Sequence, residues 1–305
     1  MLSLNLFSTF IPDKRKDIRS LQNETGLPKD MLAVFEHFYG LKKVAIYDEG
    51  GVFSLIENAL LKLQYDVSQI NYLIYLHTAD WVLPQGDSLL KRVQDKFGLS
   101  RCHFFEISYA RCASYFIALE LLSKLFKYSD CVSALILTGE IAFTPALRVV
   151  PQSSIVSDVS TAAIWLNSPG VHQLLSVVNK FIRGYEKGIY LTMDELKKFD
   201  LIYIENTVSV VKEALLKAKL SLSEITYILP HNVNLSTWRN ISSALHFPIE
   251  KIYLKNIPEL GHSFCSDHLI NLESLILEGL LKPGDYYLMV GCGLGFTLSA
   301  AVFRF

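Results

Sequence analysis

Short apolar runs rich in branched and aromatic residues alternate along this chain with longer amphipathic segments. The runs predict strands over residues 72–77, 134–138, 162–166, 227–230 and 286–290. The amphipathic segments predict helices over residues 57–64, 112–126, 208–219 and 269–281. Alternation of this kind is typical of βαβ units. Strands that are apolar at nearly every position indicate sheets covered by helices on both faces.

The chain also repeats itself at a distance of about 155 residues. Residues 54–72 (SLIENALLKLQYDVSQINY) align without a gap with residues 209–227 (SVVKEALLKAKLSLSEITY). Residues 112–122 (CASYFIALELL) align in the same way with residues 265–275 (CSDHLINLESL). A period this long exceeds that of solenoid repeats, so it indicates two copies of one α/β unit packed on each other.

The junction between the two copies falls in residues 166–187, where an Asn-Ser-Pro-Gly turn is followed by a stretch without a strong period. This gives an N-terminal half over 1–170 and a C-terminal half over 171–305. Pockets form preferentially at domain interfaces, so we expect the functional site at the seam between the halves.

Composition narrows the class of protein. Half of the 305 residues are hydrophobic, and 29 Lys and Arg stand against 30 Asp and Glu, with no basic block. Nucleic acid is therefore not an expected partner. Residues 1–16 lack the basic region and cleavage site of a signal peptide and predict a buried first strand, and no run is long enough to span a membrane. Five cysteines without a CxxC pair favour a reducing cytoplasm. The apolar fraction favours an oligomer or a partner subunit.

Cys112 is the first candidate for chemistry, because it stands where a strand-like segment, 104–108, gives way to a helix. A thiol at a helix N-terminus lies at the positive end of the helix dipole, which favours the nucleophilic thiolate. The alternative interpretation is a small buried apolar side chain.

Two histidines occupy matching places in the second half. His231 follows the strand 227–230, and His262 directly precedes the helix that mirrors the helix of Cys112. Ligands of open α/β sheets bind outside the carboxyl ends of the strands. We therefore expect Cys112, His231 and His262 to converge in one buried pocket at the seam.

Two further patterns carry alternatives. Residues 291–295 read Gly-Cys-Gly-Leu-Gly, which suits either a tight turn or backbone N–H groups brought close to a substrate as an oxyanion hole. His262, Cys265 and His268 have the spacing of metal ligands on one helix face, but no fourth ligand is visible, so no metal is expected.

With these residues in hand, the chain resembles the thiolase-fold condensing enzymes, and within them the ketoacyl-acyl-carrier-protein synthase III group. The matching segments are the nucleophile region Cys112-Ala113-Ser114, Asp158 within 156–161, His231-Asn232-Val233-Asn234, the turn 293–297 and the terminal Arg304-Phe305. Counted from the C-terminus, the family's oxyanion-hole N–H falls on Leu294, paired with the N–H of Cys112.

The chain departs from the family at several places. Within 156–161 only Asp158 is kept, and the short N-terminal region lacks the family's usual Trp and Arg contacts to coenzyme A. His262 stands where the family has Asn, and the set Cys-His-His is that of the related synthase I and II branches. Ser236 stands where an Arg that contacts coenzyme A is expected. Such departures are typical of relatives in secondary metabolism.

The resemblance implies a thiolase-like α/β fold of two duplicated halves, each with a five-stranded sheet, in five α/β/α/β/α layers. It implies a Cys112 acyl-enzyme fed by an acyl-CoA or acyl-carrier-protein thioester, without a bound cofactor, in a homodimer or a heterodimer with a related subunit. His231 and His262 would then serve the acceptor, foremost in decarboxylative Claisen condensation. Transfer to a hydroxyl or amine, with His231 as the base, is the alternative, and a non-catalytic partner subunit is a second one.

Overall fold

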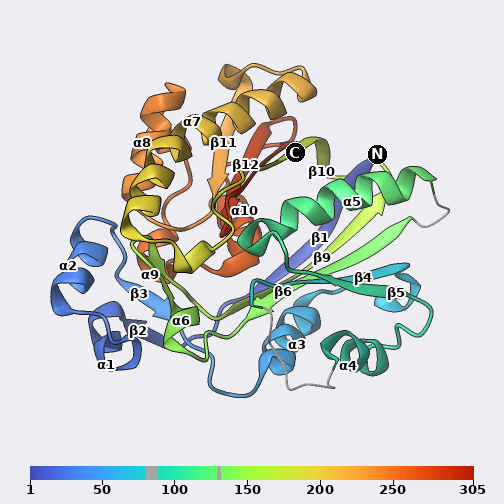
Figure 1. Cartoon of the computed structure of the whole chain (residues 1–305). Coiled ribbons are helices and arrows are strands. Elements are labelled where there is room, and N and C mark those ends of the chain that lie inside the picture. Colours follow the sequence, from blue (N-terminus) through green and yellow to red (C-terminus); the bar gives the residue numbers. More distant parts are fainter. Residues whose placement is uncertain (80–87, 129–131) are drawn as a thin grey trace.

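Nine strands form one continuous mixed sheet in the computed structural model, which describes residues 1–79, 88–128 and 132–305 (Figure 1). In sheet order they are β11 (Ile225–Pro230), β12 (Tyr286–Gly293), β13 (Thr297–Arg304), β10 (His172–Phe181), β1 (Leu2–Phe10), β9 (Val159–Asn167), β6 (Ser133–Glu140), β4 (Tyr72–Leu76) and β5 (His103–Ile107). The principal helices are α3 (Val52–Lys62), α4 (Leu89–Lys96), α5 (Ser114–Tyr128), α7 (Met193–Ala218), α8 (Leu235–Leu245) and α10 (Asp267–Leu277). Smaller elements are β2 (Arg15–Asp17), β3 (Lys43–Ala45), β7 (Val149–Val150), β8 (Ser154–Ile155), α1 (Gln22–Thr25), α2 (Lys29–His37), α6 (Pro145–Arg148) and α9 (Ile257–Leu260).

The same chain path occurs twice in this sheet. The order β1, α3, β4, β5, α5, β6, β9 is followed by β10, α7, β11, α10, β12, β13. The two parts of the sheet meet at β1 and β10, whose antiparallel register pairs Ser3 with Gln173 and Leu4 with His172. In the second copy a single bridge at Ile252, beside Ile228, stands where the first copy has β5. The seam is therefore a short strand contact in the middle of the sheet.

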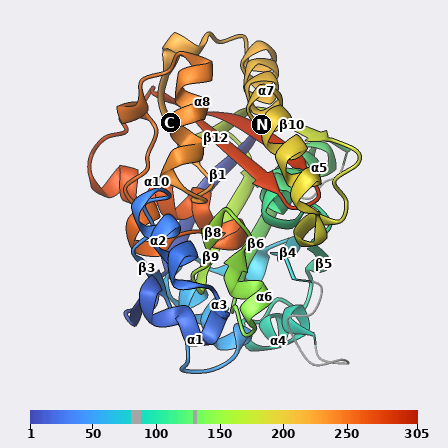
Figure 2. The same ribbon diagram turned by 60° about the vertical axis from the view of Figure 1, so that its left-hand side comes forward.

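Helices separate the two parts into five layers. Figure 2 shows α7 and α8 at one end of the molecule, α3 and α4 at the other, and α5 with α10 between them. Residues of α3 and α4 pack on β4, β6 and β9, and residues of α7 and α8 pack on β11, β12 and β13. The order α/β/α/β/α that the resemblance implied is confirmed.

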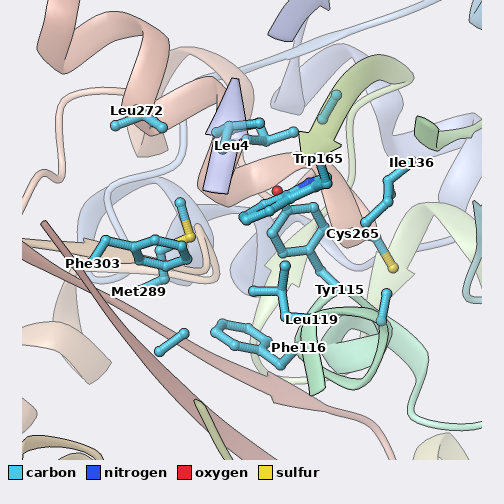
Figure 3. Close-up of a cluster of buried hydrophobic side chains, with 14 of the residues drawn as sticks. Leu4, Tyr115, Phe116, Leu119, Ile136, Trp165, Cys265, Leu272, Met289 and Phe303 are labelled. Carbon is cyan, nitrogen blue, oxygen red and sulfur yellow. The ribbon is translucent and has the colours of Figure 1, made fainter. Parts of the chain in front are cut away.

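One of two large buried clusters surrounds the middle layer. It joins Trp165 and Ile136 of the first half to Met289 and Phe303 of the second through Leu119 of α5 (Figure 3). Burial of a large apolar side chain contributes about 1.5–3 kcal/mol, so this layer holds the halves together. It also fixes the N-terminal ends of α5 and α10 against each other, where the short 3-10 turns that open the two helices are in contact.

Most of the expected elements are present, and three features differ from the sequence analysis. No strand was predicted in the stretch 166–187, which lacks a strong period, but it contains β10, most of whose residues are half-exposed. The C-terminal half has four strands and one bridge rather than five strands. Helix α7 begins at Met193 and not at 208, because Thr192 and Glu195 form a reciprocal capping box there. The exact boundary between the halves stays a prediction.

The N-terminal segment is the buried strand that the sequence predicted, since β1 lies between β9 and β10. Among the described residues, no helix is both long and apolar enough to cross a membrane.

Candidate active site

Two cavities meet at the N-terminal ends of α5 and α10. The larger, of about 400 Å³, is lined by residues of both halves, including Cys112, His231 and His262. The second, of about 370 Å³, also reaches Cys112, His262 and Leu294. The structure thus brings together all three side chains that the sequence singled out.

Cys112 lies in a tight turn, Arg111–Ala113, that leads directly into α5. Its side chain is buried but borders the cavity. The residue before it, Arg111, has a φ of 51°, a conformation that a residue with a Cβ adopts at a cost of about 1–3 kcal/mol. A backbone bond between the Arg111 amide and the Ser108 carbonyl, 2.8 Å, holds this turn. Strain of this kind is common where a side chain must be presented to a site.

His262 contacts the thiol of Cys112 directly. Its Nε2 lies 3.0 Å from the Cys112 sulfur, and its Nδ1 lies 2.6 Å from an oxygen of Asp267. The preceding Gly261 has a φ of 57°, and a Cβ there would lie 2.3 Å from the carbonyl oxygen of Ile155. Glycine at 261 therefore lets the chain pass close to β8 and turn the imidazole toward the cysteine.

Asp267 is a member of this cluster that sequence reasoning missed. It is the first residue of α10 and is fully buried. Besides His262, it accepts hydrogen bonds from the backbone N–H of Ser263 at 2.7 Å and of Asn232 at 2.6 Å. The sequence did hold one signal for it, since this acidic residue opens a helix five positions after a candidate histidine. A favourable interaction with the helix dipole explains an acidic residue at that place equally well.

Charge in this cluster is set by burial and by close pairs. Burial alone would lower the pKa of His262, but the charges and hydrogen bonds of Asp267 and Cys112 outweigh it and hold that pKa well above 6.5. Burial likewise favours the neutral form of Asp267, yet His262 keeps the pKa of Asp267 below its ordinary value. The imidazolium so stabilised is a counter-charge for a thiolate on Cys112.

His231 occupies a different environment 6.4 Å from His262, measured between ring centroids. It follows β11, and Trp238 donates a 2.9 Å hydrogen bond to its backbone carbonyl. Its Nε2 lies 3.3 Å from the hydroxyl of Tyr203, and its Nδ1 is buried without a partner. Burial first, and then the neighbouring charge of His262, lower the pKa of His231 to about 3, so the ring is neutral near pH 7. Among the described residues, no hydrogen bond joins His231 to the Cys112 sulfur.

Leu294 lies in the turn between β12 and β13 and lines both cavities. The adjacent Gly293 is pressed against the segment before Cys112, since a Cβ there would lie 1.9 Å from the Ala110 carbonyl oxygen. The glycines therefore bring this turn against the nucleophile, as an oxyanion hole requires.

Two other patterns have structural roles. The first is the spacing of His262, Cys265 and His268. Cys265 donates a hydrogen bond to the Arg111 carbonyl at 3.3 Å, and His268 Nε2 lies 3.0 Å from the Val290 carbonyl, so each of these two side chains contacts a backbone carbonyl. Among the described residues no group of three or more His, Cys, Asp or Glu could hold a metal ion. Asp158 forms a buried ion pair with Arg148 at 2.9 Å, and it does not belong to the site.

Comparison with known proteins supports the resemblance in sequence. Residues 215–305 match the family described as 3-oxoacyl-[acyl-carrier-protein (ACP)] synthase III C terminal. A β-ketoacyl-[acyl-carrier-protein] synthase III of Fusobacterium nucleatum is 24% identical over 98% of this chain and 94% of its own length. One of Clostridium perfringens is 28% identical over 70% of this chain and 71% of its own.

Solved structures share the fold. ChlB3, described as an acyltransferase, superimposes with a TM-score of 0.86 and 21% identity, over 99% of this chain and 97% of its own. The 3-oxoacyl-[acyl-carrier-protein] synthase III of Aquifex aeolicus gives 0.82 with 19% identity over the whole of both chains. A variant of OleA from Xanthomonas campestris, with bound lauric acid and lauroyl-CoA, gives 0.81 with 15% identity over 100% and 99%.

Proposed function

We propose that this chain is a divergent thiolase-fold member of the ketoacyl synthase III-like proteins, an acyl-transferring condensing enzyme that works through an acyl group carried on Cys112. The observation that supports this most directly is the 3.0 Å contact between the Cys112 sulfur and His262 Nε2. A cysteine nucleophile can be activated by an adjacent base within hydrogen-bond reach that a third group orients. Asp267 is placed to be that group.

The first half-reaction follows from this geometry. The Cys112 thiolate attacks the carbonyl carbon of an acyl thioester, and the backbone N–H groups of Cys112 and Leu294 stabilise the oxyanion. When the tetrahedral intermediate collapses, the bond to the carrier sulfur breaks. The imidazolium of His262 gives its Nε2 proton to the leaving thiolate. The acyl group then remains on Cys112, and His262 is neutral.

The donor in this scheme is an acyl-CoA or an acyl-carrier-protein thioester, and no resident cofactor takes part. The second half-reaction transfers the acyl group to a carbon, a hydroxyl or an amine. In this scheme His262 serves acylation as well as the acceptor, because it contacts the nucleophile. A role in secondary-metabolite biosynthesis fits the departures from the family pattern.

Assembly and location belong to the same proposal. Strand β5 is the last strand of the sheet order and has one neighbour, so its outer edge is open to a second copy or a related subunit. Phe104 on this strand is 42% exposed, which fits an apolar contact there. Four cysteines, Cys102, Cys112, Cys265 and Cys292, are free thiols, as expected in a reducing cytoplasm.

The acyl-enzyme is tested by intact-mass measurement after incubation with acetyl and longer acyl thioesters. The wild-type protein is expected to gain the mass of one acyl group, mapped to the peptide of Cys112. The Cys112→Ala variant should gain none, whereas Cys265→Ala, its counterpart in the second copy, should be acylated like the wild type. An adduct that persists on Cys112→Ala would contradict the assignment. A protein that forms no adduct with any thioester would support the non-catalytic alternative.

A further inference from the structure

We infer that the acceptor of the second half-reaction is an uncharged or cationic hydroxyl or amine compound, and that Asp267 positions His262 as the base that deprotonates it. This inference rests on the proposed acyl-enzyme at Cys112 and chooses among its possible acceptors. It makes His262, and not His231, the base of the transfer step.

The position of Asp267 supports this assignment first. One oxygen of its carboxylate lies 2.6 Å from Nδ1 of His262. It also accepts the backbone N–H groups that directly follow the two histidines, those of Asn232 and Ser263. One buried carboxylate thus fixes both histidine loops, and its charge requires a proton on His262 Nδ1. Asp267 is a positioning residue, since its effect on the substrate passes through the imidazole.

The proton count then determines what His262 can do. Acylation uses the Nε2 proton to protonate the leaving thiolate. The other proton stays on Nδ1, which is hydrogen-bonded to Asp267. In the acyl-enzyme, Nε2 therefore carries a lone pair at the site of the acyl group. When a hydroxyl or amine attacks the acyl carbon, Nε2 takes its proton. Collapse of the intermediate breaks the bond to the Cys112 sulfur, and the thiolate and imidazolium of the resting site are restored.

Decarboxylative condensation makes a different demand on the same atoms. Loss of carbon dioxide from a malonyl thioester leaves an enolate oxygen, which needs N–H donors and offers no proton to a base. His262 Nε2 is an acceptor after acylation and does not supply that donor. His231 Nε2 faces the hydroxyl of Tyr203 at 3.3 Å, and its Nδ1 is buried without a partner.

The charge of the larger cavity agrees with this choice. The described residues that line it include no lysine and no arginine, and Asp200 contributes a carboxylate. A malonyl carboxylate would meet no basic side chain in this cavity, a cationic amine would meet the carboxylate of Asp200, and a neutral hydroxyl compound needs no counter-charge. The basic residues Arg111 and Lys187 line the second cavity, beside Glu186. The polar lining residues Asn234, Thr237 and Asn240 can accept and donate hydrogen bonds to such an acceptor.

The test begins with wild-type protein acetylated on Cys112. The acyl-enzyme is mixed separately with ethylamine, glycerol or malonyl-N-acetylcysteamine, quenched at intervals and weighed. Ethylamine or glycerol is expected to discharge the adduct faster than water and to give an amide or an ester, and the two arms distinguish amine from hydroxyl acceptors. Discharge by the malonyl thioester alone, with a β-ketoacyl product, would overturn the inference. Failure to form the adduct at all would contradict the acyl-enzyme itself.

Variants separate positioning from folding. In Asp267→Asn the amide can donate to His262 Nδ1, which leaves the proton on Nε2, so discharge should fall about a hundredfold or more, the range typical of a lost general base. Asp267→Glu keeps the carboxylate and should recover part of this rate. Asp158→Asn is the matched control, because Asp158 is also buried and accepts two backbone N–H groups. It should lower stability while leaving the discharge rate per folded molecule unchanged.

The pH profile gives a readout that a purely structural role would not move. The titratable groups facing His262 are Asp267, Cys112, His231 and His268. Discharge of the wild-type acyl-enzyme should fall as pH is lowered, because solvent then reprotonates Nε2 of His262 and removes the base, and this dependence should be absent in Asp267→Asn. A profile and rate in Asp267→Asn equal to those of the wild type would refute the positioning role.

Discussion

The two cysteines at the starts of the central helices have the same backbone and opposite environments. Arg111 before Cys112 has a φ of 51°, and Phe264 before Cys265 has a φ of 52°. A short 3-10 turn then leads into α5 or α10 in each case. Yet Cys112 borders the cavity and contacts His262, whereas Cys265 is 1% exposed and belongs to the apolar cluster of the middle layer (Figure 3).

This difference shows that a helix start and a strained turn do not by themselves make a nucleophile. Burial is the largest cause that raises the pKa of Cys265 well above its ordinary value, and the carboxylate of Glu140 adds to it. Cys112 instead has an imidazole within 3.0 Å. Duplication thus supplied two equivalent turns, and the groups packed around them determine which cysteine can react.

The largest expected effect is a difference in reactivity between these two thiols. In the native protein at neutral pH, iodoacetamide should alkylate Cys112 at least about a hundredfold faster than Cys265, because the thiolate is the nucleophile and burial keeps Cys265 protonated. Peptide mapping of the carbamidomethyl groups over time measures both rates in one sample. Replacement of His262 by Ala should slow Cys112 and leave Cys265 unchanged. Equal labelling of both cysteines would remove the electrostatic distinction drawn above.

The two histidines should affect stability in opposite ways as pH changes. The pKa of His231 is lowered to about 3, so its contribution is present above about 6.5, its unfolded value, and is lost as pH falls. At about pH 5 this loss amounts to roughly 2 kcal/mol. The pKa of His262 is raised, so its contribution is present below about 6.5 and is lost as pH rises through its higher folded value.

Urea unfolding at about pH 5 and about pH 7.5 measures both contributions. His231→Gln should lose less stability than the wild type on acidification. The deficit of His262→Gln relative to the wild type should be larger at the acidic value. A common pH dependence for both variants would show that the two sites are not electrostatically distinct.

The smallest expected effect compares two glycines that both have a positive φ. Gly261 and Gly279 have φ values of 57° and 66°, but only at Gly261 would a Cβ meet a carbonyl oxygen, at 2.3 Å. Both alanine variants carry the cost of placing a Cβ at a positive φ, about 1–3 kcal/mol. Gly261→Ala should lose about 1 kcal/mol more and should also lower acylation, since it displaces His262. If both variants lost equal stability and kept full acylation, the close approach to β8 would have no role.

Local sequence predicted the parts of this molecule in which each residue's environment follows from its neighbours along the chain. The strands β4, β6, β9, β11 and β12 are apolar at nearly every position, and their predicted segments fall within the observed ones or extend one residue beyond. Strand β10 was missed because its partly exposed residues follow neither a buried nor an alternating pattern.

The candidate site also contains residues that the sequence predicted and residues that it did not. Cys112, His231 and His262 could be proposed from their places at strand and helix ends. Asp267 could not, because its importance comes from two backbone N–H groups and an imidazole that tertiary structure brings to it. The different environments of the two histidines were also hidden, since the partner of His231, Tyr203, lies on a helix 28 residues earlier.

The place of β1 in the sheet has a consequence for how the chain is made. Strand β1 pairs with β9 along its length, from Leu2 opposite Asn167 to Phe10 opposite Ser160, and then with β10. Neither partner exists when β1 leaves the ribosome, because β9 begins only at Val159. This apolar segment therefore waits for neighbours that are synthesised much later, and contacts so distant in sequence slow folding. During translation, β1 is a part of the nascent chain that a chaperone would protect.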